Sequence, residues 1–381
     1  MNIVVGGGLC VAVRQDVKTQ TAGVLRANIR LVPAHEAFDS WLEALLRVVK
    51  PPYWLTGDAP WRDVVLSSRV RIARSVEGFA FPHRERSDAL IALARRVRST
   101  LAWEVREQLS EAEKAILVGS RLVSHDFRWG DPGRLLLLNE DRSASVLVNE
   151  EDHLRIQAVT PGLSPQYGET LALQVERTLG EELPFAESPE MGFLTACPTN
   201  CGSGRRIGAM LHIAGLSARG WIHGIVAQLR QDGYEVRGPL GEGTPGWGAF
   251  AQISSLRRNT LELYGVIRGL IDQEYQARAS LGQDFIRYRV DLTYDEIRTA
   301  ESLTAAQAIR LLGWLRLGAV TGALDLPVQA LDATTSLVWI GPSEPAWNVR
   351  RARLLRELDR FASVWTGRTP TMRTRGEGHV R

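Results

Sequence analysis

The sequence contains little cysteine and no long hydrophobic run. Its three cysteines are Cys10, Cys197 and Cys201. Three cysteines are too few for a disulfide framework and fit a reducing cytosol, so we expect a cytoplasmic protein. No stretch approaches the roughly 18 consecutive apolar residues of a membrane-spanning helix, and we expect no membrane partner. A chain of 381 residues can bury about 75% of its unfolded surface, so it needs no disulfide or structural metal to fold.

Lysine is almost absent as well. Only Lys18, Lys50 and Lys114 occur, and arginine supplies the remaining positive side chains, a bias that we attribute to the coding composition of the genome. The formal net charge of +3 is too small to indicate a nucleic-acid partner. An apolar content of 44% and a charged content of 23% are those of an ordinary globular protein.

The pattern of predicted elements divides the chain into four parts. Residues 1–35 begin apolar and glycine-rich but lack a basic segment and a cleavage site, so we expect a disordered leader or an over-extended gene start. Residues 36–283 mix short strands with helices and predict a catalytic domain of the α/β class. Residues 284–365 have helical spacing and predict a second, helical domain, and the polar residues 366–381 predict a disordered tail.

An acidic turn, Asn149–Arg155, lies between two strand-like runs at residues 145–148 and 156–159. Three consecutive carboxylates between apolar strands can be buried only if they are paired or bind a cation. By itself such a turn is interpreted as a solvated surface loop. The arginine-bearing segments elsewhere in the chain favour a functional interpretation.

The first of these segments is Ser67–Arg71, which follows a strand-like run. Strand alternation places Arg69 and Arg71 on the same face, where they would form either a solvated basic edge or a binding site for one polyanion.

Two further segments contain glycine loops. Residues 192–206 run from a strand through a Cys-Pro turn into a second strand, but they match neither a P-loop nor a dinucleotide fingerprint, and Cys197 with Cys201 is a weak zinc signal. Residues 233–244 open a strand into a glycine-rich loop with Arg237 and Glu242, which is typical either of a mobile clamp or of a long hairpin connection.

The blocks Ser67–Arg71, Asn149–Arg155, Cys197–Arg206 and Arg237–Glu242 resemble the signature blocks of the phosphagen kinases, the ATP:guanido phosphotransferases, in the same order. The resemblance covers residues 64–263. It implies an α/β (α+β) fold with an antiparallel sheet flanked by helices, as in the phosphagen-kinase and glutamine-synthetase-like catalytic domain, followed by a small helical domain. Only 66 residues precede Ser67, fewer than in small-guanidine kinases, so the chain is most similar to the bacterial protein-arginine kinases of this superfamily.

The resemblance also implies roles for individual residues. The catalytic residues would be Glu151, Glu242 and Cys197, and the substrate guanidinium would face Glu150, Glu151 and Glu242. ATP, with Mg²⁺ and no protein-bound metal, would contact Ser67, Ser68, Arg69, Val70, Arg71, Arg121, Arg155, Arg206, Ile207, Gly208, Ala209, Met210, Arg237, Gly238, Pro239, Leu240, Gly241 and Glu242. Arg121 falls where relatives have a histidine near adenine, and His125 lies four residues further on.

The chemistry agrees with these residue types. Phosphoryl transfer needs positioning and neutralisation of phosphate charge, for which arginine offers planar bidentate donors. The acceptor guanidinium needs carboxylates that orient it and take its proton. We expect Asp152 to make structural contacts or contacts to metal-bound water, and Asn149 and His153 to orient the loop.

We therefore expect a kinase that transfers the ATP γ-phosphate to arginine side chains of proteins and marks them for Clp-type proteolysis and stress regulation. The alternatives are a minimal small-guanidine phosphagen kinase and a non-catalytic adaptor that binds phosphoarginine or a nucleotide. The resemblance further implies a homodimer and three partners: a zinc-containing activator protein, a Clp ATPase and a stress repressor. The product-sensing motif of the family, Arg-Asp-x-x-Arg-Ala, is reduced to Arg351-Ala352, because Trp347 and Asn348 occupy its first two positions.

Overall fold

The computed structural model describes the strands β1 (Ile3–Gly6) and β2 (Leu9–Ala12) and residues 51–109, 111–123, 127, 130–238, 247–338 and 345–359. Contacts divide the chain into two units, Met1–Lys50 and Pro51–Arg381. In the first unit β1 and β2 form an antiparallel pair within the predicted leader.

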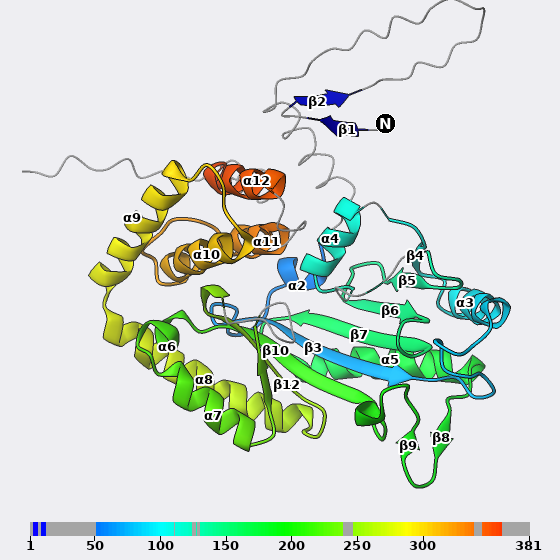
Figure 1. The fold of residues 1–381 in the computed structure, drawn as a ribbon. Coiled ribbons are helices and arrows are strands. Elements are labelled where there is room, and N and C mark those ends of the chain that lie inside the picture. Colours follow the sequence, from blue (N-terminus) through cyan, green and yellow to red (C-terminus); the bar gives the residue numbers. More distant parts are fainter. Residues whose placement is uncertain are drawn as a thin grey trace, which may run out of the picture. The chain divides into compact units, whose positions relative to one another are not determined.

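The second unit is built on an eight-stranded sheet in the order β11-β12-β10-β3-β7-β6-β5-β4 (Figure 1). Every neighbouring pair is antiparallel, which confirms the predicted antiparallel sheet with its flanking helices. The strands are β3 (Val65–Arg74), β4 (Glu104–Arg106), β5 (Leu135–Leu138), β6 (Ala144–Val148), β7 (Leu154–Pro161), β10 (Arg205–His212), β11 (Glu235–Arg237) and β12 (Phe250–Ser255). The short strands β8 (Glu187–Ser188) and β9 (Gly192–Phe193) form a separate hairpin.

The helices have well-defined starts where the sequence provides capping residues. Asn259 and Glu262 form a capping box at the start of α8, and Thr304 and Gln307 form one at α10. The α-helices are α2 (Tyr53–Thr56), α3 (Ser87–Leu101), α4 (Glu111–Gly119), α5 (Pro165–Glu182), α6 (Ala214–Ala218), α7 (Ile222–Gln231), α8 (Thr260–Leu281), α9 (Gln283–Thr299), α10 (Ala305–Val320), α11 (Val328–Val338) and α12 (Pro345–Arg356). The short 3-10 helices are η1 (Pro198–Asn200) and η2 (Trp247–Ala249). Across the described ranges, no helix has the length and hydrophobicity needed to cross a membrane.

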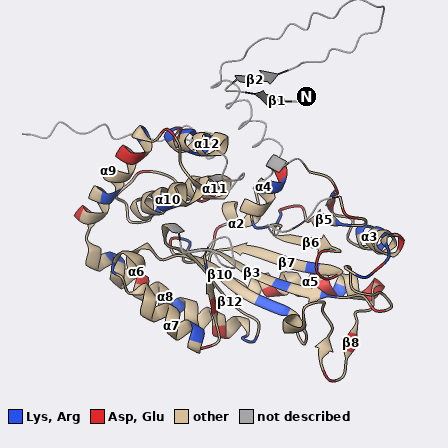
Figure 2. Ribbon diagram, viewed as in Figure 1, with Lys and Arg blue, Asp and Glu red and all other residues tan. Residues whose placement is uncertain are grey.

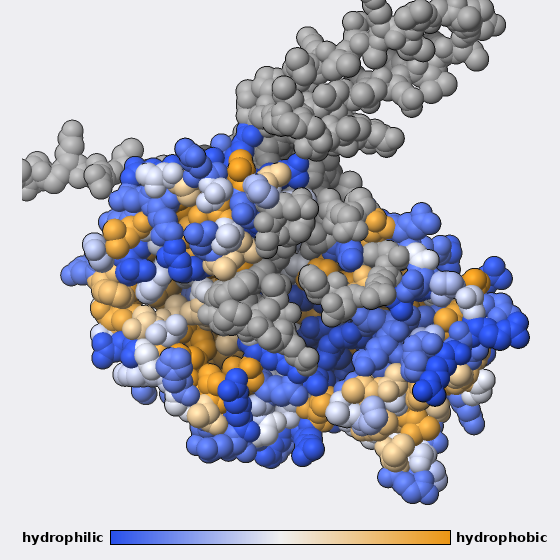
Figure 3. Space-filling view, viewed as in Figure 1, coloured by the Kyte–Doolittle hydropathy of each residue, from blue (hydrophilic) through white to orange (hydrophobic). Residues whose placement is uncertain are grey.

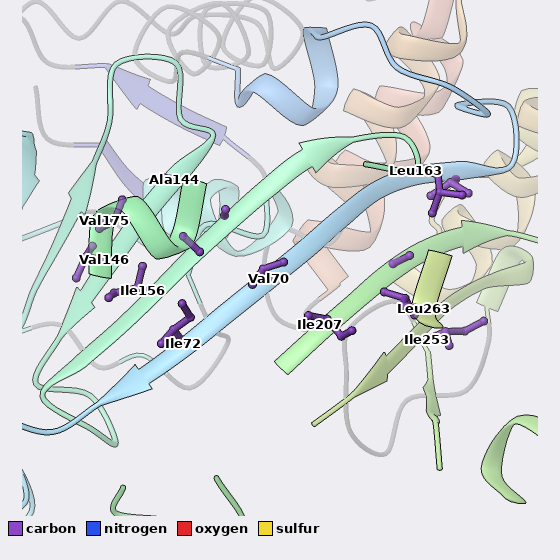
Figure 4. Packing of buried hydrophobic residues seen from close by; sticks show 14 of the residues in the cluster. Val70, Ile72, Ala144, Val146, Ile156, Leu163, Val175, Ile207, Ile253 and Leu263 are labelled. Carbon is purple, nitrogen blue, oxygen red and sulfur yellow. The ribbon is translucent and has the colours of Figure 1, made fainter. Parts of the chain in front are cut away.

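One face of the sheet carries the main hydrophobic core. Val70 and Ile72 of β3, Ile156 of β7, Ile207 of β10 and Ile253 of β12 are all buried on this side (Figure 4). Helices α3, α5 and α8 supply the other half of the core, through apolar residues at helical spacing. Side chains alternate along a strand, so the residues directly before and after each of these core residues point to the opposite face of the sheet.

The opposite face carries a smaller hydrophobic cluster. At its β5–β6 end a second cluster packs Leu117, Leu122 and Phe127 against Leu136 and Leu147. This cluster leaves the central strands β7, β3 and β10 available for other contacts on the same face.

Helices α9 to α12 follow Gly282, which separates α8 from α9. Their packing includes a fully buried guanidinium, that of Arg316 in α10, which bonds to Asp332 in α11 at 2.7 Å and to the backbone carbonyls of Asp63 and Arg62 at 2.8 Å each. Since Pro51–Arg381 form one compact unit, the predicted domain boundary after residue 283 stays a prediction.

Candidate active site

The register of β3 and β10 brings distant arginines to one face of the sheet. Arg71 lies directly opposite Arg206, and Arg69 lies opposite Gly208. Directly opposed residues of an antiparallel pair point to the same side, and so do residues two apart in one strand. Arg69, Arg71 and Arg206 therefore share the face that does not carry the main core. A side chain at Gly208 would clash with β12, because its Cβ would lie 2.8 Å from Ile253 O and 2.9 Å from Ser254 Cβ.

The strand on the other side of β3 adds a fourth arginine. Arg71 is opposite Gln157 of β7, and Ala73 is opposite Arg155. Arg155 consequently points to the same face as Arg71. Figure 2 shows basic residues on all three central strands, and Figure 3 shows a hollow lined by hydrophilic residues over the same region.

Arg237 joins this group through β12. Arg237 is opposite Gln252, which is itself opposite Met210 of β10. Met210 is four residues after Arg206 in β10, so the two side chains point to the same face of the sheet. Gln252 and Arg237, which lie opposite Met210 in successive strands, point to this face as well. We call the five residues Arg69, Arg71, Arg155, Arg206 and Arg237 the arginine face.

The charges of the arginine face repel one another at close range. Burial, followed by the charge of Arg155, lowers the pKa of Arg69 to about 9 and the pKa of Arg71 well below its usual value. The side chain of Arg71 makes no hydrogen bond or ion pair with any described residue. Desolvated cations that repel one another are costly unless an anion joins them, so this face has the electrostatics of a polyanion site.

Acidic and amide side chains hold the other guanidiniums in place. Arg155 Nη1 lies 2.5 Å from Glu150 Oε2, and Arg69 Nη2 donates to Gln157 Oε1 at 2.5 Å. Glu150, predicted at the substrate guanidinium, thus pairs with an arginine of the cluster. Gln157 was not predicted from the sequence, although its position two residues after Arg155 on β7 is the signal that could have identified it.

Glu235 is a second residue that the sequence reasoning missed. Its Oε2 lies 2.5 Å from Arg206 Nη1 and also pairs with Arg237 Nη2. Glu235 precedes Arg237 by two residues on β11, so the alternation of this strand could have placed both on one face.

Arg121 lies at one end of the arginine face. Its Nη1 donates to Ser67 Oγ at 2.6 Å, and its guanidinium carbon lies 4.7 Å from the ring centroid of Trp54. Burial lowers its pKa to about 10. Its backbone has a positive φ of 62°, a region that L-residues seldom adopt. Arg121 is thus fixed near the start of β3, and His125 lies outside the described residues.

Some residues predicted to bind ATP point to the other side of the sheet. Val70, Ile207 and Ala209 belong to the main core. Ser68 Oγ donates to Gly162 O at 2.8 Å and accepts a hydrogen bond from Ser164 N–H at 2.9 Å, both next to α5. Only the backbone of these four residues is therefore available to a ligand on the arginine face.

Two side chains of the acidic turn, those of Asn149 and His153, hold it to neighbouring backbone. Asn149, with a φ of 54°, donates through its amide to Leu90 O at 3.1 Å and Gly133 O at 2.8 Å. His153 Nδ1 accepts a hydrogen bond of 3.0 Å from Val76 N–H. These contacts agree with the predicted orienting role of Asn149 and His153, and they leave Glu151 as the exposed carboxylate of the turn.

Asp152 connects this turn to the cysteine loop. Its Oδ1 accepts hydrogen bonds from Ala196 N–H at 2.7 Å and from Ser75 Oγ at 3.3 Å. Burial raises the pKa of Asp152. Because Asp152 follows Glu151 and Ala196 precedes Cys197, this bond joins the two segments that contain these predicted catalytic residues.

Cys197 directly precedes η1 and is half-buried. Its Sγ lies 3.0 Å from Thr199 Oγ1. Cys197 and Cys201 are both free thiols. Of the predicted glycine-rich clamp, Gly238 is buried at the end of β11, whereas Pro239, Leu240, Gly241 and Glu242 lie outside the described residues.

Three comparisons with known proteins bear on this site. The sequence profile of the ATP:guanido phosphotransferase, C-terminal catalytic domain, matches residues 91–277. The protein-arginine kinase of Pelotomaculum thermopropionicum is 34% identical over 303 residues, which are 74% of this chain and 85% of that protein. The protein-arginine kinase of Symbiobacterium thermophilum is 35% identical over 293 residues, or 71% of this chain and 83% of that protein.

Among solved structures, the duplicated taurocyamine kinase from Schistosoma mansoni with bound transition state analog components has a similar fold. It superposes with a TM-score of 0.52 at 20% identity, covering 72% of this chain and 44% of that chain. The profile match includes β7 with Arg155, β10 with Arg206, and β11 with Arg237, so the matched segment contains three of the five residues of the arginine face.

Proposed function

The chain belongs to the ATP:guanido phosphotransferase family, and from this premise we propose that it transfers the γ-phosphoryl group of ATP to the guanidinium groups of arginine side chains in proteins. The observation that carries the proposal is the arginine face, which gathers guanidiniums from β3, β7, β10 and β11 beside the turn of Glu151. The protein acceptor is favoured by the relatives, which are protein-arginine kinases.

The arginine face would bind the triphosphate. ATP carries several negative charges, and phosphoryl transfer depends on neutralising them and on positioning the γ-phosphorus. Arg71, which has no described partner, and Arg69, whose pKa is lowered by burial, would both gain from an anion on this face. Removing one such arginine from a phosphoryl-transfer site costs about 10³–10⁵ in rate.

Mg²⁺ would arrive with the nucleotide. Among the described residues no group of three or more His, Cys, Asp or Glu could hold a metal ion, and the side chains of the arginine face are cations. The described part of the chain therefore offers no cluster for a resident metal, and we assign no step of the reaction to one.

Glu151 would hold the acceptor. A nitrogen of the substrate guanidinium attacks the γ-phosphorus, the N–P bond forms, and the bond between the γ-phosphorus and the bridging oxygen of ADP breaks. The attacking nitrogen must lose a proton, and its free pKa lies above about 12. The exposed carboxylate of Glu151 can orient the guanidinium and accept this proton, which typically contributes about 10²–10⁴ in rate. Glu242 stays the predicted second carboxylate, and Cys197 the predicted neighbour of the acceptor.

The resemblance supports a more specific role, which we include in the proposal. Phosphorylated arginines would mark proteins for Clp-type proteolysis and stress regulation in the cytoplasm. The enzyme would act as a homodimer with a zinc-containing activator protein, a Clp ATPase and a stress repressor as partners.

A labelling assay tests the proposed activity. The full chain, incubated with ATP, Mg²⁺ and an arginine-rich protein, is expected to produce phosphate on arginine that is labile in acid and stable in base. Glu151→Gln should lose about 10²–10⁴ in turnover and still bind nucleotide in a calorimetric titration. Glu181→Gln is the matched control, because Glu181 is exposed on α5 on the other side of the sheet.

Two outcomes would favour the alternatives. Rapid labelling of free arginine or creatine without labelling of any protein would indicate a small-guanidine kinase. Binding of nucleotide or phosphoarginine that is unchanged in Glu151→Gln, with no transfer by either protein, would indicate an adaptor.

A further inference from the structure

A cavity of about 800 Å³ lies beyond the Arg237 end of the arginine face. Its walls come from η1 and the loop that follows it, the start of β10, the end of α7, β11 and the turn after β12. The charged residues of the lining are Arg205, Arg230, Glu235, Arg237 and Arg257. The predicted ATP-binding residues include only Arg237 of these, so the cavity extends beyond the proposed nucleotide site.

The lining of the cavity is strongly basic. Four arginines and one glutamate line it, which gives a formal charge of +3 from these five residues. Arg205 pairs with Glu169, and Arg237 pairs with Glu235. The guanidiniums of Arg230 and Arg257 are exposed and have no hydrogen-bond or ion-pair partner among the described residues. These two positive charges are therefore available to an external anion.

The cavity also contains apolar surface between the arginines. Val236 and Leu256 are half-buried in its wall, and Tyr234 is buried there. A site for a free inorganic anion needs no such surface. Arginines separated by apolar residues suit a peptide, whose carboxylates would pair with guanidiniums while its aliphatic carbons pack against the wall.

The position of the cavity relates it to the acceptor. Its lining begins at Pro198, directly after Cys197, and the bond between Asp152 and Ala196 holds Cys197 near the turn of Glu151. An extended chain advances about 3.3–3.6 Å per residue. Residues a few positions away from an arginine seated at Glu151 would therefore reach the cavity.

We propose that this cavity is a docking subsite for an acidic segment of the protein substrate, a few residues from the arginine that is phosphorylated. The proposal rests on the proposed function, since it assumes a protein acceptor. Arg230 and Arg257 would pair with aspartate or glutamate side chains of the substrate. The enzyme would accordingly prefer arginines with acidic neighbours on one side.

The test compares two acceptor peptides that differ only in charge. Each peptide contains one arginine and a segment of three further residues on one side of it. These three residues are aspartates or glutamates in the acidic peptide and the corresponding asparagines or glutamines in the amide peptide. The pair is tested once with the segment before the arginine and once with the segment after it. The variant carrying Arg230→Gln and Arg257→Gln is compared with a control carrying Arg95→Gln and Arg177→Gln. Arg95 on α3 and Arg177 on α5 are exposed, make no ion pair with a described residue, and lie on the helices behind the main core.

For the cavity variant we expect kcat/KM on the acidic peptide to fall about tenfold, because two partly exposed ion pairs are lost. The amide peptide and the KM for ATP should be unchanged, and the control variant should behave like the wild type. Equal losses on both peptides, or no loss on either, would overturn the proposal. A raised KM for ATP would assign the cavity to the nucleotide instead.

A binding measurement separates this proposal from the proposed function. A fluorescent peptide with the acidic segment but no arginine is titrated with the full chain and followed by anisotropy. Saturable binding that weakens about tenfold in the cavity variant, and not in the control, supports the subsite even if no peptide is phosphorylated. Binding that is the same in all three proteins excludes it, whatever the kinase activity.

Discussion

Asp152 Oδ1 accepts a hydrogen bond of 2.7 Å from the backbone N–H of Ala196, so one carboxylate joins the turn of Glu151 to the loop of Cys197. The two segments are far apart in the sequence, and this bond fixes their spacing. Asp152 touches no reacting atom in the proposed mechanism and is a positioning residue.

Asp152→Ala should therefore impair transfer without impairing nucleotide binding. A displacement of about 1 Å at a reacting centre costs on the order of 10²-fold in rate, and we expect a loss of that size in kcat with an unchanged KM for ATP. Asp152→Asn keeps an oxygen acceptor for Ala196 N–H and removes a carboxylate whose pKa is raised by burial, so it should restore most of the rate.

The alkylation rate of the Cys197 thiol provides a second measurement for this pair of variants. It should change in Asp152→Ala and return to the wild-type value in Asp152→Asn. Equal kcat in the wild type and Asp152→Ala would show that the bond does not position the site.

Glu235 is an internal competitor for the phosphates. One oxygen of its carboxylate pairs with both Arg206 and Arg237, where a phosphate oxygen would otherwise bind. Glu235→Gln removes this charge, and we expect the KM for ATP to fall about threefold to tenfold, which corresponds to roughly 0.7–1.4 kcal/mol. The KM for ATP is measured by varying the ATP concentration at a fixed acceptor concentration, and Asp272→Asn on α8 is the control. A rise in KM would show that Glu235 instead holds the two arginines in their binding positions.

Arg71 should contribute to catalysis at the expense of stability. It is half-buried, unpaired among the described residues and surrounded by like charges. Arg71→Met should raise the free energy of unfolding of the unliganded protein by about 1–2 kcal/mol, because it removes an uncompensated charge. The same change should lower turnover by about 10³ or more.

Urea unfolding with and without pyrophosphate measures the stability of Arg71→Met. The anion should stabilise the wild type more than the variant. A variant that is less stable than the wild type in the absence of anions would contradict the repulsion inferred for the arginine face.

The part of the site that lies within one strand was predictable from the sequence. Strand alternation is a local property, so the spacing of Arg69 and Arg71 was enough to place them on one face. The meeting of Arg155, Arg206 and Arg237 with them depends on the register between strands, which spacing alone does not determine. The proximity of these five arginines was suggested only by the four signature segments, which occur in the same order as in the phosphagen kinases.

Other features of the site depend on contacts between segments. Glu150 and Glu151 were both predicted to face the substrate guanidinium, but the structure pairs Glu150 with Arg155 and leaves Glu151 exposed. Arg230 and Arg257 belong to no signature block, and they meet only because the end of α7 and the turn after β12 line one cavity. Such meetings follow from tertiary packing and have no local sequence signal.

The stability of the protein should fall in mild acid through His153. Burial lowers the pKa of His153, and its Nδ1 is an acceptor for Val76 N–H, so the folded state holds the neutral ring. In the unfolded chain the pKa is about 6.5. As the pH falls below about 6.5 the unfolded state takes up the proton first, and the free energy of unfolding decreases by up to about 1.4 kcal/mol per pH unit until the folded pKa is reached.

His153→Asn tests this dependence, since the asparagine Oδ1 can accept the same hydrogen bond without titrating. Urea unfolding at several pH values between 7 and 5 should give a shallower slope for the variant than for the wild type. Parallel slopes would show that His153 is protonated equally in both states, which its burial and its acceptor bond argue against.

The buried ion pair of Arg316 and Asp332 should have a large effect on the stability of the protein. Both side chains are fully buried and bond at 2.7 Å, and Arg316 also donates to the carbonyls of Asp63 and Arg62. The pair thereby connects α10 and α11 to the segment that leads into β3. Asp332→Ala leaves a buried guanidinium without its counter-charge and should cost about 3–5 kcal/mol.

The control for this variant is Asp295→Ala, which removes the partner of Arg298 in an exposed pair and should change the free energy of unfolding by less than about 1 kcal/mol. The double variant Arg316→Met and Asp332→Leu removes both charges and should recover most of the loss, because a buried ion pair can be replaced by apolar residues at little cost. If the double variant is as unstable as Asp332→Ala, the hydrogen bonds from Arg316 to the two carbonyls, rather than the uncompensated charge, hold the helices to the sheet.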